Sequence, residues 1–191
     1  MKIAYNAPVI LNFTLISVLV LIINALFDGF KGLFMVHSFS YDVPINYFQL
    51  FSHVAGHADW NHLLGNFSFI LLLGPLVEEK YGSKNLLFMI LATGFFTGIL
   101  HILFFNAALL GASGIVFMLI ILSSMSGMHG NRIPLTFVLI VILYLGKEFV
   151  NLFEENQISE FAHIIGGLMG SVFGFLLNKP KKTNLPLESE S

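Results

Sequence analysis

Long runs of apolar residues follow one another along most of this chain, and short polar stretches separate them. A helix that crosses the hydrocarbon core of a membrane needs about 20 residues of this kind. The pattern predicts six membrane-spanning helices, which cover roughly residues 9–27, 61–77, 85–105, 113–126, 133–150 and 161–177. We therefore expect an all-α membrane protein, built as a six-transmembrane-helix bundle in the lipid bilayer.

The composition supports a membrane protein. Of the 191 residues, 56% are hydrophobic and 10% are charged, whereas about 25% are charged in a soluble domain. The net charge of −2 gives no sign of attraction to nucleic acid, and we expect no nucleic-acid partner. The chain has no cysteine, which excludes disulfides, thiolate catalysis and cysteine metal ligands.

The distribution of basic residues predicts the orientation, because Lys and Arg accumulate on the cytoplasmic side of a membrane. With a cytoplasmic N-terminus, Lys31 and Lys147 fall outside, and the other seven fall inside: Lys2, Lys80, Lys84, Arg132, Lys179, Lys181 and Lys182. We expect a single core domain over 1–178, a short cytoplasmic tail over 179–191, and both termini in the cytoplasm. The compact core is typical of a protein of the bacterial cytoplasmic membrane.

Polar residues stand at the start of three predicted spans. Asn61, His62 and Asn66 begin the second span, Ser113 the fourth and His163 the sixth. These three spans run in the same direction, so their first residues lie on one side of the membrane at similar depth. Polar groups at membrane depth cost free energy and are functional hypotheses by default. The sequence therefore predicts that they form one site.

The fourth span is too short to cross the whole membrane. Its 14 residues, 113–126, make a helix about 21 Å long, against about 30 Å of hydrocarbon. If its lower end reaches the cytoplasmic surface, Ser113 lies roughly 10 Å below the outer surface. Irregular backbone at that depth has to line a cavity or pack in protein, so we expect a water-filled hollow above Ser113.

Glycines on the sixth span predict a close helix contact. His163, Gly166, Gly167, Gly170 and Gly174 share one helical face. Such small-residue spacing lets another helix approach closely, and we expect this face to pack on residues 113–126. His163 would then lie beside Ser113, as a general base lies beside its nucleophile.

His62 and Asn66 complete the predicted site. They are four residues apart, share a helical face and can both donate hydrogen bonds. Donors beside a serine and a histidine suit a developing oxyanion. The backbone N–H groups at the start of the 113–126 helix would add to this stabilisation.

Each feature also has a simpler interpretation. Ser113 alone could cap a helix, and a single buried histidine is usually a packed core residue. The spacing of His53 and His57 would allow zinc, but no further ligand follows in a zinc pattern, so we expect no metal and no cofactor. Glu160 could orient His163, but we favour a solvated charge there and predict no catalytic triad.

Four short motifs resemble the rhomboid family of intramembrane serine proteases. Gly111 to Gly114 read GASG, Ala162 to Gly170 read AHIIGGLMG, and His62 to Asn66 read HLLGN, within GHADWNHLLGN. The segment GPLVEEKYGS, residues 74–83, is also similar to the family. The likeness extends over about residues 47–177, with the motifs in the family's order.

The resemblance implies a six-helix rhomboid-like core that cleaves transmembrane or membrane-proximal segments of protein substrates. Ser113 would be the nucleophile and His163 the general base, as a dyad without Asp. His62 and Asn66 would form the oxyanion hole, and Gly111 would leave room beside the nucleophile. We expect substrates to enter from the side, between the second and fifth spans.

Two positions depart from the family pattern. Phe117 stands where members often have a tyrosine that packs on the catalytic histidine, so ring stacking is expected without the hydroxyl. The Trp-Arg pair common in the first outer loop is missing from residues 28–59. The alternative function is a proteolytically inactive rhomboid-like protein that binds transmembrane helices, which would be expected to lack Ser113 or His163.

Overall fold

The computed structural model describes residues 3–27, 29–125, 128, 132–151 and 158–177. The predicted tail over 179–191 lies outside the described residues, as do Lys2, Lys179, Lys181 and Lys182, which contributed to the predicted orientation. The tail, the domain boundary at residue 178 and the cytoplasmic termini stay predictions.

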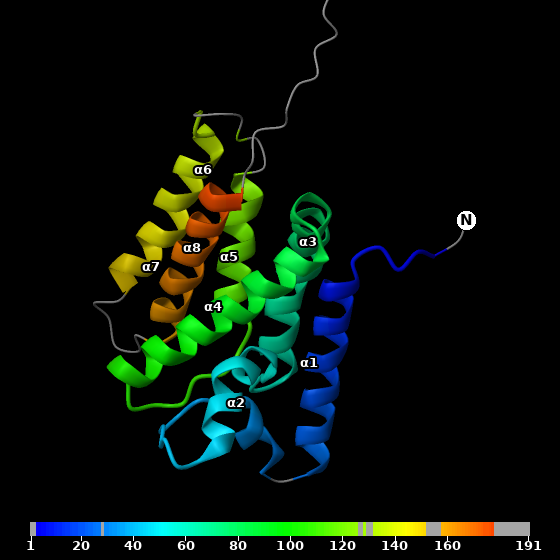
Figure 1. Ribbon diagram of the computed structural model, residues 1–191, viewed down its shortest axis with the longest axis vertical. Coiled ribbons are helices and arrows are strands. Elements are labelled where there is room, and N and C mark those ends of the chain that lie inside the picture. Colours follow the sequence, from blue (N-terminus) through cyan, green and yellow to red (C-terminus); the bar gives the residue numbers. More distant parts are fainter. Residues whose placement is uncertain (1–2, 28, 126–127, 129–131, 152–157, 178–191) are drawn as a thin grey trace, which may run out of the picture.

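Four of the described helices are long and apolar enough to cross a membrane, which makes the chain an integral membrane protein (Figure 1). They are α1 (Pro8–Leu26), α3 (Trp60–Tyr81), α4 (Ser83–Phe104) and α8 (Ile158–Leu177). The apolar helix α5 (Ser113–Ser124) is shorter. Helix α6 (Leu135–Ile140), the π-helical turn η3 (Val141–Leu145) and α7 (Gly146–Asn151) follow one another without a gap. The predicted all-α fold is confirmed, and the count of six spans stays a prediction.

The long connection after α1 contains helices that the apolar pattern does not predict: η1 (Phe30–Phe34), α2 (Pro44–Ser52) and η2 (His53–Ala55). Gln49 and Ser52 of α2 donate hydrogen bonds to the carbonyls of Gly32 and Leu33, at 2.7 and 2.6 Å. On α4, Gly98 allows the backbone of α2 to come close. The connection is therefore folded against the bundle beside α4, at one end of the molecule in Figure 1.

Glu78 ties three helices together at the opposite end. Its carboxylate accepts hydrogen bonds from the backbone N–H groups of Val9 and Ile10, at 3.0 and 3.1 Å, and from the Ser83 hydroxyl at 2.7 Å. The first N–H groups of a helix have no partner within it, so this carboxylate satisfies the start of α1. The buried Glu78 thereby joins α1 to α3 and to the first turn of α4.

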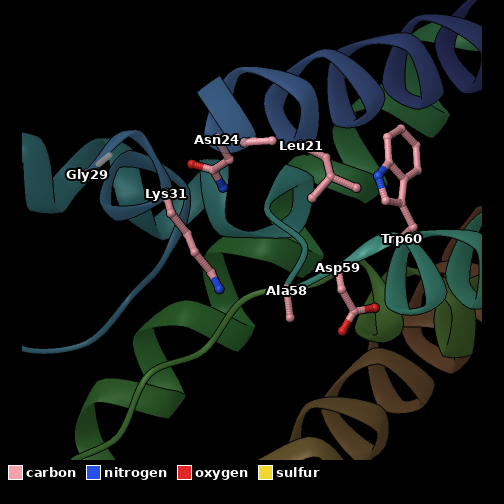
Figure 2. Close-up of a pocket in the computed structure, with 8 residues that line it drawn as sticks. Leu21, Asn24, Gly29, Lys31, Ala58, Asp59 and Trp60 are labelled. Carbon is pink, nitrogen blue, oxygen red and sulfur yellow. The ribbon is translucent and has the colours of Figure 1, made fainter. Parts of the chain in front are cut away.

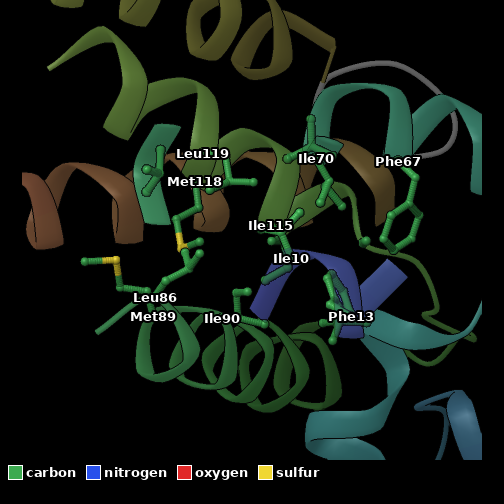
Figure 3. Packing of buried hydrophobic residues seen from close by; sticks show 14 of the residues in the cluster. Ile10, Phe13, Phe67, Ile70, Leu86, Met89, Ile90, Ile115, Met118 and Leu119 are labelled. Carbon is green, nitrogen blue, oxygen red and sulfur yellow. The ribbon is translucent and has the colours of Figure 1, made fainter. Parts of the chain in front are cut away.

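The hydrophobic core surrounds α5, whose residues from Gly114 to Leu122 are all buried. Figure 3 shows Ile115, Met118 and Leu119 of α5 among side chains that come from α1, α3 and α4. A helix that is apolar all round is typical of a buried or membrane-embedded position. The core thus holds α5, and with it Ser113, among the longer helices.

Helices α5 and α8 form the most extensive helix contact in the described residues. A Cβ atom at Gly166 would overlap the backbone of Gly114, and one at Gly170 would lie 2.7 Å from the Met118 carbonyl oxygen. The predicted packing of the glycine face on the 113–126 helix is confirmed. Gly167 is an exception, because it faces Leu145 of η3 rather than α5.

We expect Gly166→Ala to lower the free energy of unfolding by about 1–3 kcal/mol, the usual cost of forcing atoms into a packed contact. The added methyl group would meet the backbone of Gly114, which cannot move away unless α5 or α8 moves as a whole. Gly146→Ala is the matched control, since Gly146 is also helical and an added Cβ would meet no atom within 4 Å. Unfolding in mixed detergent micelles, followed by circular dichroism, measures both variants. Equal losses in the two variants would contradict this account of the α5–α8 contact.

Candidate active site

Ser113 is the first residue of α5 and is partly exposed. The segment before it is fixed by backbone hydrogen bonds, because Val36 and Leu109 pair as an isolated β-bridge and Gly111 N–H donates to the His53 carbonyl at 3.0 Å. The φ of Gly111 is +125°, a conformation that favours glycine. The connection between α1 and α3, which holds Val36 and His53, therefore sets where the start of α5 lies.

His163 lies on α8 at the end of the contact with α5 where Ser113 is found. Its ring stacks on Phe117, with centroids 4.2 Å apart and planes 7° apart. Phe117 follows Ser113 by one helical turn, so both point to the same side of α5. Gly114 also packs against Ala162, the neighbour of His163. Helix packing thus brings His163 to the side of α5 that carries Ser113, although the described residues include no hydrogen bond between their side chains.

A ring nitrogen of His163 meets a carboxylate. Nδ1 of His163 lies 2.9 Å from Oε2 of Glu148 on α7. The sequence analysis considered Glu160 as a partner of His163 and gave Glu148 no role. Glu148 is only 8% exposed and makes the contact itself. Oε2 of Glu160 is buried and has no hydrogen-bond partner among the described residues.

His62 and Asn66 of α3 lie beside the loop that precedes Ser113. A Cβ atom at Gly111 would lie 2.8 Å from Nε2 of His62 and 3.8 Å from Nδ2 of Asn66. A glycine at 111 is therefore needed for both its φ and this close approach. His62 also interacts electrostatically with His163. The four polar residues predicted to form one site thus come from α3, α5 and α8 to one region.

His57 holds Asn66 in place, which the sequence analysis did not predict. Nδ2 of Asn66 donates to Nε2 of His57 at 3.1 Å, and Nδ1 of His57 donates to the Ala55 carbonyl at 3.3 Å. This pattern requires a neutral ring. Burial, and then the charge of His62, lowers the pKa of His57 to about 4. The sequence alone gave no sign of this contact, because the burial of His57 becomes visible only once the loop is folded.

A hollow of about 400 Å³ lies beside the start of α3 (Figure 2). Leu21 and Asn24 of α1, Lys31 of η1, and Asp59 and Trp60 are among its lining residues. Asp59 also caps α3, where its carboxylate accepts a hydrogen bond from the His62 N–H at 2.8 Å. None of the predicted site residues lines this hollow.

The fold and the site define a class of protein: an all-helical membrane protein in which partly buried polar groups gather at the start of a short central helix. Residues 44–180 match the family described as the Rhomboid domain. The chain belongs to the rhomboid family.

The chain is similar in sequence to two curated proteins, which differ in identity and in length covered. Rhomboid-like protein 11, chloroplastic, from Arabidopsis thaliana is 31% identical over 148 residues, which cover 76% of this chain and 48% of that protein. The chain thus spans about half the length of this plant relative. Rhomboid protease GlpG from Haemophilus influenzae is 23% identical over 188 residues, which cover 95% of this chain and 97% of that protein.

We predict that protonation of His57 destabilises the folded chain in acid. The folded state favours the neutral ring, so the unfolded chain binds more protons between pH 6.5 and about 4. Stability therefore rises with pH through this window, by roughly 3 kcal/mol for a shift of this size. His53, whose pKa burial also lowers to about 4, adds to the wild-type slope.

His57→Gln should flatten the dependence of the unfolding midpoint on pH between about 4 and 6.5. His37→Gln is the control, because His37 is exposed and its replacement is expected to leave the curve unchanged. Denaturation midpoints in detergent micelles at several pH values measure the effect. A wild-type slope retained by His57→Gln would contradict the proposed neutral, buried state of His57.

Proposed function

We propose that this chain is an intramembrane serine endopeptidase that cleaves transmembrane or membrane-proximal segments of membrane proteins with a Ser-His dyad. The observation that carries the proposal is the stacking of His163 on Phe117, one helical turn from Ser113. The close approach of His62 and Asn66 to Gly111 supports it from the other side. Membership of the rhomboid family agrees with it, as does similarity to a protein named as a rhomboid protease.

In the proposed reaction Ser113 is the nucleophile and His163 is the general base. The Ser113 proton moves to Nε2 of His163 while Oγ forms a bond to the scissile carbonyl carbon, whose π electrons move to oxygen. His62, Asn66 and the backbone N–H at the start of α5 donate to this oxyanion. His163 then gives the proton to the leaving amine, and water releases the acyl group by the same steps in reverse order.

Hydrolysis within a membrane needs water at the serine. Helix α5 has 12 residues, so it is about 18 Å long, against about 30 Å of hydrocarbon. With the lower end of α5 near the cytoplasmic surface, Ser113 lies below the outer surface, and the proposal requires a hollow above it that admits water. We propose the bacterial cytoplasmic membrane as the location, with both termini in the cytoplasm. No metal or cofactor takes part in these steps.

A cleft between α3 and α6 supports a lateral route for the substrate. It has a volume of about 580 Å³, and its lining is mainly apolar. Leu72 of α3 and Leu139 of α6 lie on its two sides, and α5 contributes to its floor. A helix arriving from the bilayer would meet an apolar surface there. Its backbone has to unwind near the cut, because helical carbonyls are already hydrogen-bonded.

The dyad is tested with a tagged transmembrane substrate and the full chain reconstituted in liposomes. Ser113→Ala and His163→Ala should each reduce cleavage by roughly 10³-fold or more, since neither group works alone. A fluorophosphonate probe should label the wild type and neither variant. Ser68→Ala is the control, because the exposed Ser68 hydroxyl only donates to the Leu64 carbonyl at 2.7 Å. Cleavage by Ser113→Ala at the wild-type rate would overturn the proposal and favour an inactive helix-binding protein.

The lateral route is tested by cross-linking the two sides of the cleft. The chain has no cysteine, so Leu72→Cys with Leu139→Cys introduces the only thiols. A short bifunctional thiol reagent that joins them should abolish cleavage of a transmembrane substrate. Each single variant treated with the same reagent should stay active. Full activity of the cross-linked double variant would contradict access between α3 and α6.

A further inference from the structure

We propose that Glu148 is a positioning residue for the general base, so that the site works as a Ser-His-Glu arrangement rather than as a bare dyad. The inference rests on the proposed function. Glu148 comes from α7, a different helix from those that carry Ser113 and His163, and its carboxylate lies 2.9 Å from Nδ1 of His163.

The contact selects one tautomer of His163. A carboxylate can only accept a hydrogen bond, so Nδ1 carries the proton and Nε2 has a free lone pair. A base that takes a proton from Ser113 needs that free lone pair. Without Glu148, Nδ1 and Nε2 would compete for the proton, and part of the protein would hold the unproductive tautomer.

The contact also fixes the orientation of the ring. Phe117 covers one face of the imidazole, and Glu148 holds Nδ1 in its plane. Tyr144, one turn before Glu148, places its ring edge-on against Phe117, with centroids 6.1 Å apart and planes 74° apart. Tyr144 therefore contacts Phe117 and Glu148 contacts His163, both from one face of the 135–151 helix.

Glu148 has a further effect when His163 becomes charged. The proton from Ser113 arrives on Nε2, the Nδ1 proton stays on the ring, and the resulting imidazolium is stabilised by the adjacent carboxylate. Glu148 is 8% exposed, so water screens the pair weakly. The other ionisable groups around this pair are Lys147 beside Glu148, Glu160 one turn before His163, and His62 of α3. An ionisable residue at this depth is costly unless it is paired, which accounts for its position against the ring.

The inference is tested with Glu148→Gln, which keeps the shape of the side chain and removes its charge. In liposomes kcat should fall roughly 10- to 100-fold, within the range of lost acid–base assistance, while KM changes less than about twofold. Glu148→Asp should keep most of the wild-type kcat, because it retains the carboxylate. Fluorophosphonate labelling should slow in parallel with kcat. Glu160→Gln is the matched control and should keep the wild-type kcat.

Thermal unfolding of each variant in micelles separates this role from a structural one. A loss of kcat in Glu148→Gln at an unchanged Tm supports the inference, and a wild-type kcat overturns it. If Glu148→Gln does not fold, the shorter pair Glu148→Asp and Glu148→Asn gives the same comparison of charge at equal size. Ser113→Ala is measured alongside. If it is inactive while Glu148→Gln behaves as wild type, only this inference fails, and if it stays active the proposed function fails.

Discussion

The contact between α5 and α8 is the constraint on which the site depends. Gly166 and Gly170 let the two backbones approach so closely that a single Cβ atom would displace a helix. Since lipid offers no hydrophobic drive for helices to associate, such close packing is a main source of affinity between them. The same approach carries His163 to the side of α5 that bears Ser113 and Phe117. Stability and the geometry of the site therefore come from the same surface.

Three residues beside Ser113 are held by a second polar group of the protein. Asn66 is held by His57, which in turn donates to the Ala55 carbonyl. Nδ1 of His163 is held by Glu148, and the His62 backbone N–H by the cap at Asp59. Preorganised donors and bases lose little free energy to reorientation during a reaction. The network extends from α3 through the connection between α1 and α3, so residues far from Ser113 in the sequence determine its surroundings.

The sequence predicts the helices better than it predicts their partners. Apolar runs and the glycine spacing locate α1, α3, α4, α5 and α8, and they predict the α5–α8 contact, because both signals follow from local periodicity. Helix α2 mixes polar and aromatic residues and gives no such signal. Glu148 follows Lys147 near the end of an apolar run, where a charge is usually solvated, so only tertiary packing reveals its burial. Gly167 shares a helix stripe with Gly166 but meets Leu145, since three helices converge there.

Two proposed roles of the 135–151 helix require opposite behaviour. Substrate access requires the helix to move, and the contact with His163 requires it to stay in place. Leu139 and Ile140 line the cleft proposed for substrate access, whereas Glu148 contacts His163, the proposed general base, near the other end of the same helix. If the whole helix moved to admit a substrate, His163 would lose its partner when it is needed. The π-helical turn Val141–Leu145, whose Tyr144 also lines the cleft, connects the two regions, and π turns interrupt the regular hydrogen-bond ladder of a helix. Bending at this turn would let α6 move away from α3 while Glu148 stays on His163, so the proposed access and the proposed catalysis need not compete.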